Sequence, residues 1–191
     1  MNESNNERRE YFRIEDNIYL DVQVISEEEY SKAEVTLDEL SESAFSLSAE
    51  FATLNNKIHP TLNNIRQLHP DIAQYLEFLN TKIDSLSHQL LQKESIYNED
   101  KLVHANISAS GIMYESTSNL PQGERVRLEI VLFPEKIGVV IFGRIVQCQQ
   151  QNSKNCVSIE FEHLREEDQE LMIKHNLNKQ MSDIREQNNY D

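Results

Sequence analysis

Apolar and polar residues alternate along positions 17 to 25. Four apolar residues occupy every second position of this segment, namely Ile18, Leu20, Val22 and Val24. A period of two predicts a β-strand that buries one face. After Leu102 the chain again shows short β-like segments, and five strands are predicted over residues 102–107, 111–116, 124–133, 136–149 and 155–164. Turn-like segments separate them, so the pattern favours a small antiparallel barrel, with segment 17–25 as its first strand.

Residues 27 to 100 follow a different pattern, because they lack glycine and repeat apolar residues at helical spacing. One heptad-like series comprises Leu37, Leu40, Ala44, Leu47, Phe51, Leu54 and Ile58, and a second comprises Ile72, Leu76, Leu79, Ile83, Leu86 and Leu90. These series predict amphipathic helices over 35–58 and 70–93. Pro60 is expected to interrupt the first helix, and Pro70 to lie in the first turn of the second.

The predicted fold class is therefore α+β. A small antiparallel barrel would be formed by residues 1–26 together with 101–180. The helical hairpin of residues 27–100 would be an insertion into this single barrel. The pattern of residues 165–180 predicts a closing helix. Residues 181–191 are expected to form a flexible tail.

Charge and composition narrow the classes of partner. The chain has 18 basic and 33 acidic residues, a formal charge of −15, which disfavours nucleic acid polymers and anionic membranes. A local arginine cluster can still bind a small anion, because charges are screened beyond about 8 Å at physiological salt. Without an apolar run of about 18 residues or a secretory signal, we expect a cytoplasmic protein with no membrane insertion. Two cysteines and scattered histidines do not indicate a metal site.

Two short motifs suggest a binding site. Residues 8–13, RREYFR, match the pattern RRxxxR, and residues 106–111, NISASG, match (D/N)xSxxG. Their order, their strand contexts, the late strand segment SIEF and the acidic start of the closing helix together resemble the PilZ domain family. The resemblance covers residues 8–25 and 102 to about 180. Two departures are Ser158, where the family often has glycine, and the span of more than 90 residues between the motifs.

The resemblance implies that the two motifs jointly bind the bacterial second messenger cyclic di-GMP. Arg9 and Arg13 would contact its phosphates and guanines, and Arg8 would add a further contact, since arginine can donate bidentately and stack on a base. Asn106 and Ser108 would offer polar groups to a guanine edge. Gly111 would allow either close approach of the ligand or a positive φ.

The segment before the barrel is predicted to act as a mobile clamp. Its polar composition predicts disorder in the free protein, and charge pairing with the ligand would order it over NISASG. Tyr11 and Phe12 in this segment would either stack on a base or, as the favoured alternative, plug the barrel.

The helical hairpin is expected to mediate self-association. Two amphipathic helices alone leave much of each apolar series in water, and pairing with other copies into a bundle would bury it. A tetrameric subgroup of PilZ proteins is similar in having long heptad helices. The alternative is that the hairpin packs on its own barrel. The choice between dimer and tetramer stays open.

No catalytic constellation, Walker loop or GxGxxG is present, so an enzyme is not expected. The favoured function is a cyclic di-GMP receptor that uses no cofactor, oligomerises through helices 35–58 and 70–93, and signals through a protein partner that the sequence does not name. It would signal by ordering its arginine segment. The alternative is a PilZ-like structural adaptor that does not bind the messenger and acts through its helices.

Overall fold

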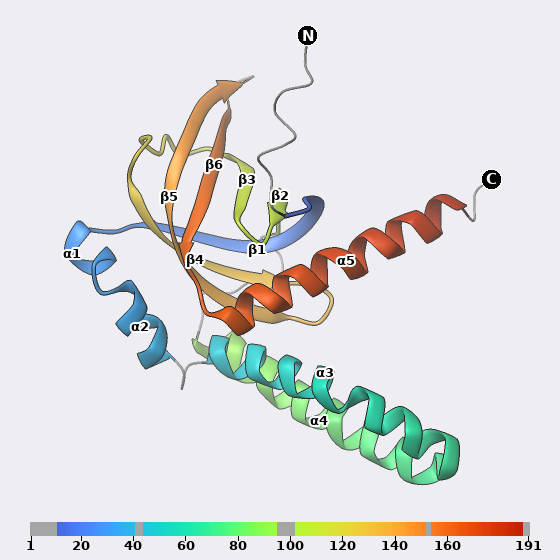
Figure 1. Cartoon of the computed structure of the whole chain (residues 1–191). Coiled ribbons are helices and arrows are strands. Elements are labelled where there is room, and N and C mark those ends of the chain that lie inside the picture. Colours follow the sequence, from blue (N-terminus) through green and yellow to red (C-terminus); the bar gives the residue numbers. More distant parts are fainter. Residues whose placement is uncertain (1–10, 41–43, 95–101, 152–153, 189–191) are drawn as a thin grey trace.

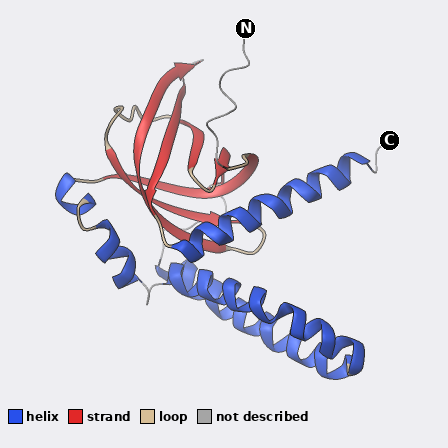
Figure 2. Cartoon of the chain, in the orientation of Figure 1, coloured by secondary structure: helices blue, strands red, loops and turns tan. Residues whose placement is uncertain are grey.

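The computed structural model describes residues 11–40, 44–94, 102–151 and 154–188. Within them the chain forms a barrel of strands with long helices projecting from one side (Figure 1). Figure 2 shows that strands and helices occupy separate regions of the molecule. This arrangement is the α+β class that the sequence predicts.

The barrel consists of six strands: β1 (Ile14–Val24), β2 (Leu102–Ser108), β3 (Gly111–Ser116), β4 (Arg125–Leu132), β5 (Ile137–Gln151) and β6 (Lys154–His163). They close in the order β1-β2-β3-β6-β5-β4, and every neighbouring pair is antiparallel. The predicted small antiparallel barrel is confirmed. Strand β1 begins at Ile14, three residues earlier than the pattern indicated.

A row of isoleucines crosses the interior of the barrel. The strand registers pair these residues in sequence around the wall: Ile14, Ile107, Ile112, Ile159 and Ile145. Each is at most 6% exposed, and burial of such a side chain contributes roughly 1.5–3 kcal/mol. Because side chains alternate along a strand, Glu15 and Asn106, which neighbour this row, face outward.

In the described part of the chain between β1 and β2 there are four helices: α1 (Glu27–Tyr30), α2 (Ala33–Glu39), α3 (Ala44–Leu68) and α4 (Pro70–Glu94). The single first helix predicted over 35–58 is therefore wrong, because its beginning belongs to α2. Leu37 of α2 is 5% exposed and joins a small cluster with Tyr19 and Val140 on the barrel. Contact with the barrel, rather than with a heptad partner, explains its place in the apolar pattern.

Helix α3 runs through Pro60 and ends at Leu68, so the predicted interruption at Pro60 is also wrong. Proline in a helix interior removes one hydrogen bond and costs about 3 kcal/mol. Packing against α4 offsets this cost, because the two helices contact each other along the hairpin. Helix α4 begins at Pro70, as the sequence predicted.

The apolar series of α4 is largely exposed. Among its described side chains, the buried ones are the small residues Ala73 and Ser87. Six large apolar residues, which we call the α4 stripe, are between 37% and 63% exposed: Ile72, Tyr75, Leu79, Ile83, Leu86 and Leu90. Figure 1 shows one end of the hairpin beside the barrel and α5, whereas the other end points away.

Helix α5 (Glu166–Asn188) closes the chain against the barrel. Leu171 and Met172 are buried in the barrel core. Arg165 precedes the helix and donates to both carboxylate oxygens of Asp168, at 2.8 Å each, and to Ser46 of α3 at 2.6 Å. The helix continues to Asn188, so residues 181–188, expected as a tail, are helical. Within the described residues, no helix is long and apolar enough to cross a membrane.

Candidate functional site

The described parts of the two motifs lie beside each other at one end of the barrel. Ile14 of β1 pairs with Ile107 of β2 in antiparallel register. Extending this register by one residue sets Arg13 beside Ser108, the central residue of NISASG. Arg8 and Arg9 lie outside the described residues, so their expected roles stay predictions. Arg13 is half-buried.

Asn106 makes a hydrogen bond that the sequence did not predict. Its side-chain amide donates to Glu15 Oε1 at 2.6 Å, across the β1–β2 pair. The other carboxylate oxygen of Glu15 lies 3.3 Å from His104 Nε2. Glu15 therefore places a negative charge directly opposite Asn106 and two residues from Arg13 along the strand. The sequence could have indicated this contact, because Glu15 follows Arg13 by two residues and therefore lies on the same face of the strand.

Ser108 is fully buried and shapes the β2–β3 turn. Its hydroxyl donates to the carbonyl oxygen of Gly111 at 3.2 Å and accepts the amide N–H of Ser110 at 3.3 Å. The carbonyl of Ser110 in turn accepts the amide N–H of Phe161 on β6, at 3.0 Å. These bonds fix the NISASG turn onto the neighbouring strand, so Ser108 has a structural role in the chain alone.

Gly111 is required by the packing of the barrel. A Cβ atom at this position would lie 2.7 Å from the carbonyl oxygen of Ile159, well inside normal contact. Among the described glycines, Gly123 alone has a positive φ. The positive-φ explanation for Gly111 is therefore wrong. The close approach that this glycine permits is to the β6 backbone.

Further charged residues continue the surface beyond Gly111. Gly111 pairs with Glu160 of β6, which pairs with Arg144 of β5. Arg144 Nη2 lies 3.1 Å from Glu160, and its Nε donates to Glu162 at 3.0 Å. Residues distant in sequence thus bring a second guanidinium near the NISASG turn, which the motif patterns did not indicate.

The aromatic residues between the arginines have different surroundings. Tyr11 is partly buried and packs against the barrel core, whereas Phe12 is 54% exposed. The plug interpretation thus fits Tyr11 and does not fit Phe12.

A polar cluster around Glu162 connects the first helix to the barrel. Its carboxylate accepts hydrogen bonds from Tyr30 of α1, from Arg125 Nη1 at 2.5 Å and from Arg144 Nε at 3.0 Å. Burial raises the pKa of Tyr30 to about 12, and the bond to Glu162 adds to that rise. Tyr30, Arg125 and Arg144 each bond to Glu162, so the cluster stabilises the contact between α1 and the barrel. Among the described residues, no group of three or more His, Cys, Asp or Glu side chains is placed to hold a metal ion.

Comparison with known families identifies the domain. Residues 86–177 match the family model of the PilZ domain. The chain contains a PilZ domain. The matched PilZ segment begins within α4 and ends within α5. It therefore includes the NISASG motif and excludes the arginine motif.

Two solved structures are similar to this PilZ chain. A tetrameric PilZ domain protein of Xanthomonas campestris, self-assembled via a helical bundle, matches with a TM-score of 0.57 and 12% identity, over 92% of this chain and 89% of that one. The Bacillus subtilis inhibitor of motility MotI/DgrA matches with a TM-score of 0.39 and 22% identity, over 44% of each chain. The first likeness supports the fold of the barrel and long helices together. No curated protein matches the chain significantly.

Proposed function

We propose that this protein is a receptor for cyclic di-GMP. The observation that supports the proposal is the β1–β2 register, which pairs Ile14, the residue after Arg13, with Ile107 of the NISASG motif in a PilZ domain. This adjacency joins the end of the arginine motif to the second motif on one surface. The ligand's two phosphates and two guanines are groups that arginine and short polar side chains recognise.

Binding would bring the arginine segment onto the strand surface. Arg8 and Arg9 would pair with phosphate or guanine, next to Arg13, and each charge-assisted bond would contribute roughly 1.5–3 kcal/mol. Asn106 would exchange its bond with Glu15 for one to the ligand. The carboxylate of Glu15 would have to turn away from the phosphates, because like charges repel in this partly screened position. Ligand binding would thus change the contacts of β1 as well as order the segment before it.

The hairpin would join copies of the chain into a dimer or tetramer. The α4 stripe follows steps of three and four residues and leaves six large apolar side chains in contact with water. Exposed apolar surfaces of this kind mark interaction sites, and heptad spacing fits a helical partner. The Xanthomonas protein, whose fold this chain shares, assembles via a helical bundle. These observations favour a second copy as the partner of the stripe.

The output would be a changed contact with another protein in the cytoplasm.

A second candidate function is a structural adaptor that does not bind the messenger. The bond between Glu15 and Asn106 favours it, because that carboxylate opposes an anionic ligand.

Calorimetric titration of the full chain with cyclic di-GMP separates the two functions. The receptor function predicts saturable binding, and cyclic di-AMP should bind at least tenfold more weakly, because adenine lacks the guanine O6 acceptor. An adaptor would give no heat of binding with either nucleotide.

A further inference from the structure

One row of side chains crosses the outer face of the barrel and includes a residue of the NISASG motif. The strand registers pair its five members in sequence, and we call them the outer row: Glu15 of β1, Asn106 of β2, Met113 of β3, Ser158 of β6 and Gln147 of β5. Directly opposed residues of neighbouring strands project from the same face of a sheet. Their strand neighbours Ile107, Ile112 and Ile159 are buried inside the barrel, so the outer row faces outward.

A β-bulge brings Gln147 onto this face. Arg144 and Gln147 both pair with outward residues of β6, although they are three positions apart. In a regular strand, residues three positions apart point to opposite faces. The register shift between Ile145 and Gln147 leaves Val146 without a partner residue and turns Gln147 outward. Bulges are frequent next to binding sites, because they change the direction of a side chain in this way.

The polar side chains at the far end of the outer row have no partners in the chain. Within the part of the chain that the structure describes, neither Ser158 nor Gln147 takes part in a side-chain hydrogen bond. The charged residues beside them are paired with each other, because Arg144 Nη2 lies 3.1 Å from Glu160 Oε2. Ser158 and Gln147 can therefore bind a ligand without breaking an existing contact.

Met113 and Ser158 form a surface on which a flat ring can pack. Met113 is half-buried and lies between Asn106 and Ser158 in the outer row. A thioether makes favourable contacts with aromatic rings, and the short side chain of Ser158 leaves the space beside Met113 open. Asn106 and Gln147 border this surface. They are separated by three strand spacings of about 4.8 Å each, which leaves room for one purine between them.

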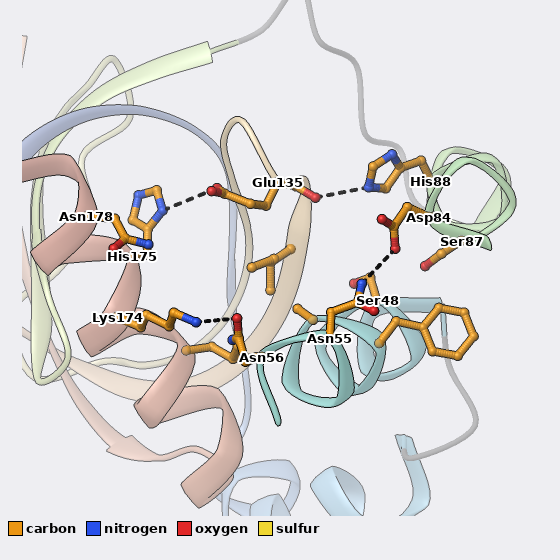
Figure 3. Close-up of a pocket in the computed structure, with 14 residues that line it drawn as sticks. Ser48, Asn55, Asn56, Asp84, Ser87, His88, Glu135, Lys174, His175 and Asn178 are labelled. Carbon is orange, nitrogen blue, oxygen red and sulfur yellow. Dashed lines mark hydrogen bonds and ion pairs between the residues drawn. The ribbon is translucent and has the colours of Figure 1, made fainter. Parts of the chain in front are cut away.

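The cavity between the hairpin, α5 and the barrel is too small for a cyclic dinucleotide (Figure 3). It has a volume of about 240 Å³, below the roughly 300–1,000 Å³ of most ligand clefts. Figure 3 shows polar side chains of its lining bonded to one another, including Lys174 to Asn56 and Asp84 to Asn55. The members of the outer row are not among its lining residues. This cavity is therefore separate from the outer row.

We propose that one guanine base of bound cyclic di-GMP packs on Met113 and Ser158 and forms hydrogen bonds with Gln147. This inference rests on the proposed receptor function. The Gln147 amide carries a donor and an acceptor, which match the O6 acceptor and the N1–H donor at the edge of guanine. Proteins commonly bind unpaired bases in this way, with the ring face packed on a side chain and the edge hydrogen-bonded. The rest of the messenger lies toward Asn106 and Arg13.

Calorimetric titration of the full chain with cyclic di-GMP tests these contacts. Met113→Ala and Gln147→Ala should each weaken binding at least fivefold. Ser158→Leu should weaken it at least tenfold, because the larger side chain occupies the place of the base, whereas Ser158→Gly should bind within twofold of wild type. Cys156→Ala and Gln149→Ala, at the next outward positions of β6 and β5, should leave binding unchanged. Circular dichroism melts check that each variant folds.

Methyl NMR gives an independent readout of the packing. The chain has four methionines, so selective labelling of their methyl groups gives few signals, and loss of one signal in Met113→Leu assigns Met113. Addition of cyclic di-GMP should move the Met113 signal upfield, because the ring current of a packed base shields a methyl group over its face. Met172, which is buried in the barrel core, should keep its shift. A Met113 signal that does not move at saturation overturns the proposal.

The outcomes separate this inference from the receptor function. If the wild-type chain does not bind cyclic di-GMP, both are wrong. If the wild type binds and Asn106→Ala weakens binding, but Met113→Ala and Gln147→Ala bind like wild type, the receptor function stands and the base lies elsewhere. Equal losses in Cys156→Ala and Gln149→Ala would also overturn the proposal, because the effect would then not depend on the outer row.

Discussion

The side-chain amide of Asn106 donates to the carboxylate of Glu15 at 2.6 Å across the first two strands of the barrel. This bond joins a residue of the NISASG motif to the strand that follows the arginine motif. Glu15 also lies 3.3 Å from His104. The carboxylate therefore occupies hydrogen-bonding groups of the surface on which an anionic nucleotide would bind, and it adds a repulsive charge there.

Replacing Glu15 with alanine should strengthen cyclic di-GMP binding about threefold to tenfold. The gain is modest because the Glu15 side chain is 58% exposed and its charge is screened. Calorimetric titration measures it. Glu115→Ala, which removes an exposed acid elsewhere on the barrel, serves as the control for net charge. Equal gains in both variants would mean that Glu15 acts through the overall charge and not through Asn106.

Replacing Arg9 with alanine should weaken cyclic di-GMP binding at least tenfold and leave the melting temperature nearly unchanged. A charge-assisted bond to phosphate or guanine is worth roughly 1.5–3 kcal/mol, and a side chain that acts on the ligand contributes little to the free barrel. Titration and thermal melts measure the two effects. Arg185→Ala, at an exposed position of α5, is the matched control. An unaltered affinity in Arg9→Ala would exclude Arg9 from the site.

The barrel could be predicted from the sequence because a strand that buries one face repeats every two residues. Ile18 and Leu20 marked β1 in this way. The division of the first helix could not be predicted, because Leu37 fits a heptad series and also fits a contact with the barrel. The predicted helix interruption at Pro60 was wrong for a related reason. Its local cost is real, but packing between α3 and α4 keeps the helix intact, and such packing is absent from local sequence patterns.

The candidate site was predictable in part. The motifs identified Arg13 and Asn106, and the strand register brings their segments together. The structural role of Gly111 was not predictable, because it depends on β6, about fifty residues away in sequence, and the same strand contacts the turn that Ser108 shapes through the bond between Ser110 and Phe161. Arg144 was missed for the same reason, since only the barrel order places it beside Glu160 and the NISASG turn.

Replacing Gly111 with alanine should destabilise the barrel by about 1–3 kcal/mol, the usual cost of forcing an extra group into a packed site. The added Cβ would lie 2.7 Å from the carbonyl oxygen of Ile159, and backbone atoms cannot move aside as a flexible side chain can. Urea unfolding measures the loss. Ser110→Ala, in the same turn, should cost less than 1 kcal/mol because its hydroxyl makes one long hydrogen bond, at 3.3 Å. Unchanged stability of Gly111→Ala would leave ligand approach as the reason for the glycine.

Replacing Leu86 with glutamate should dissociate the oligomer. Leu86 belongs to the α4 stripe and is 62% exposed in the single chain, so the charge costs little in a monomer but would be buried in a bundle. Light scattering should then give a mass near 22.3 kDa, that of one chain. Gln74→Glu, an exposed position outside the stripe, should leave the mass of the assembly unchanged. A wild-type protein that is already monomeric would contradict the proposed role of the stripe.

Glu162 should make stability depend on pH. Burial tends to raise the pKa of its carboxyl, but hydrogen bonds from Tyr30 and Arg144 and the charge of Arg125 outweigh burial and hold the pKa below its usual value. A carboxyl with a lower pKa in the folded state stabilises the protein above its unfolded pKa. That contribution is lost as the pH falls through the folded pKa.

Replacing Glu162 with glutamine should therefore destabilise the protein near pH 7 by about 1–3 kcal/mol, because two guanidinium groups and the Tyr30 hydroxyl lose their charged partner. The difference between wild type and variant should shrink as the pH falls below the ordinary range of a glutamate. Urea unfolding at a series of pH values measures it. Glu160→Gln is the control, because this acid contacts Arg144 alone among the three and its side chain is 53% exposed. A Glu162→Gln loss that stays constant across the acidic range would show that shape, and not charge, holds α1 against the barrel.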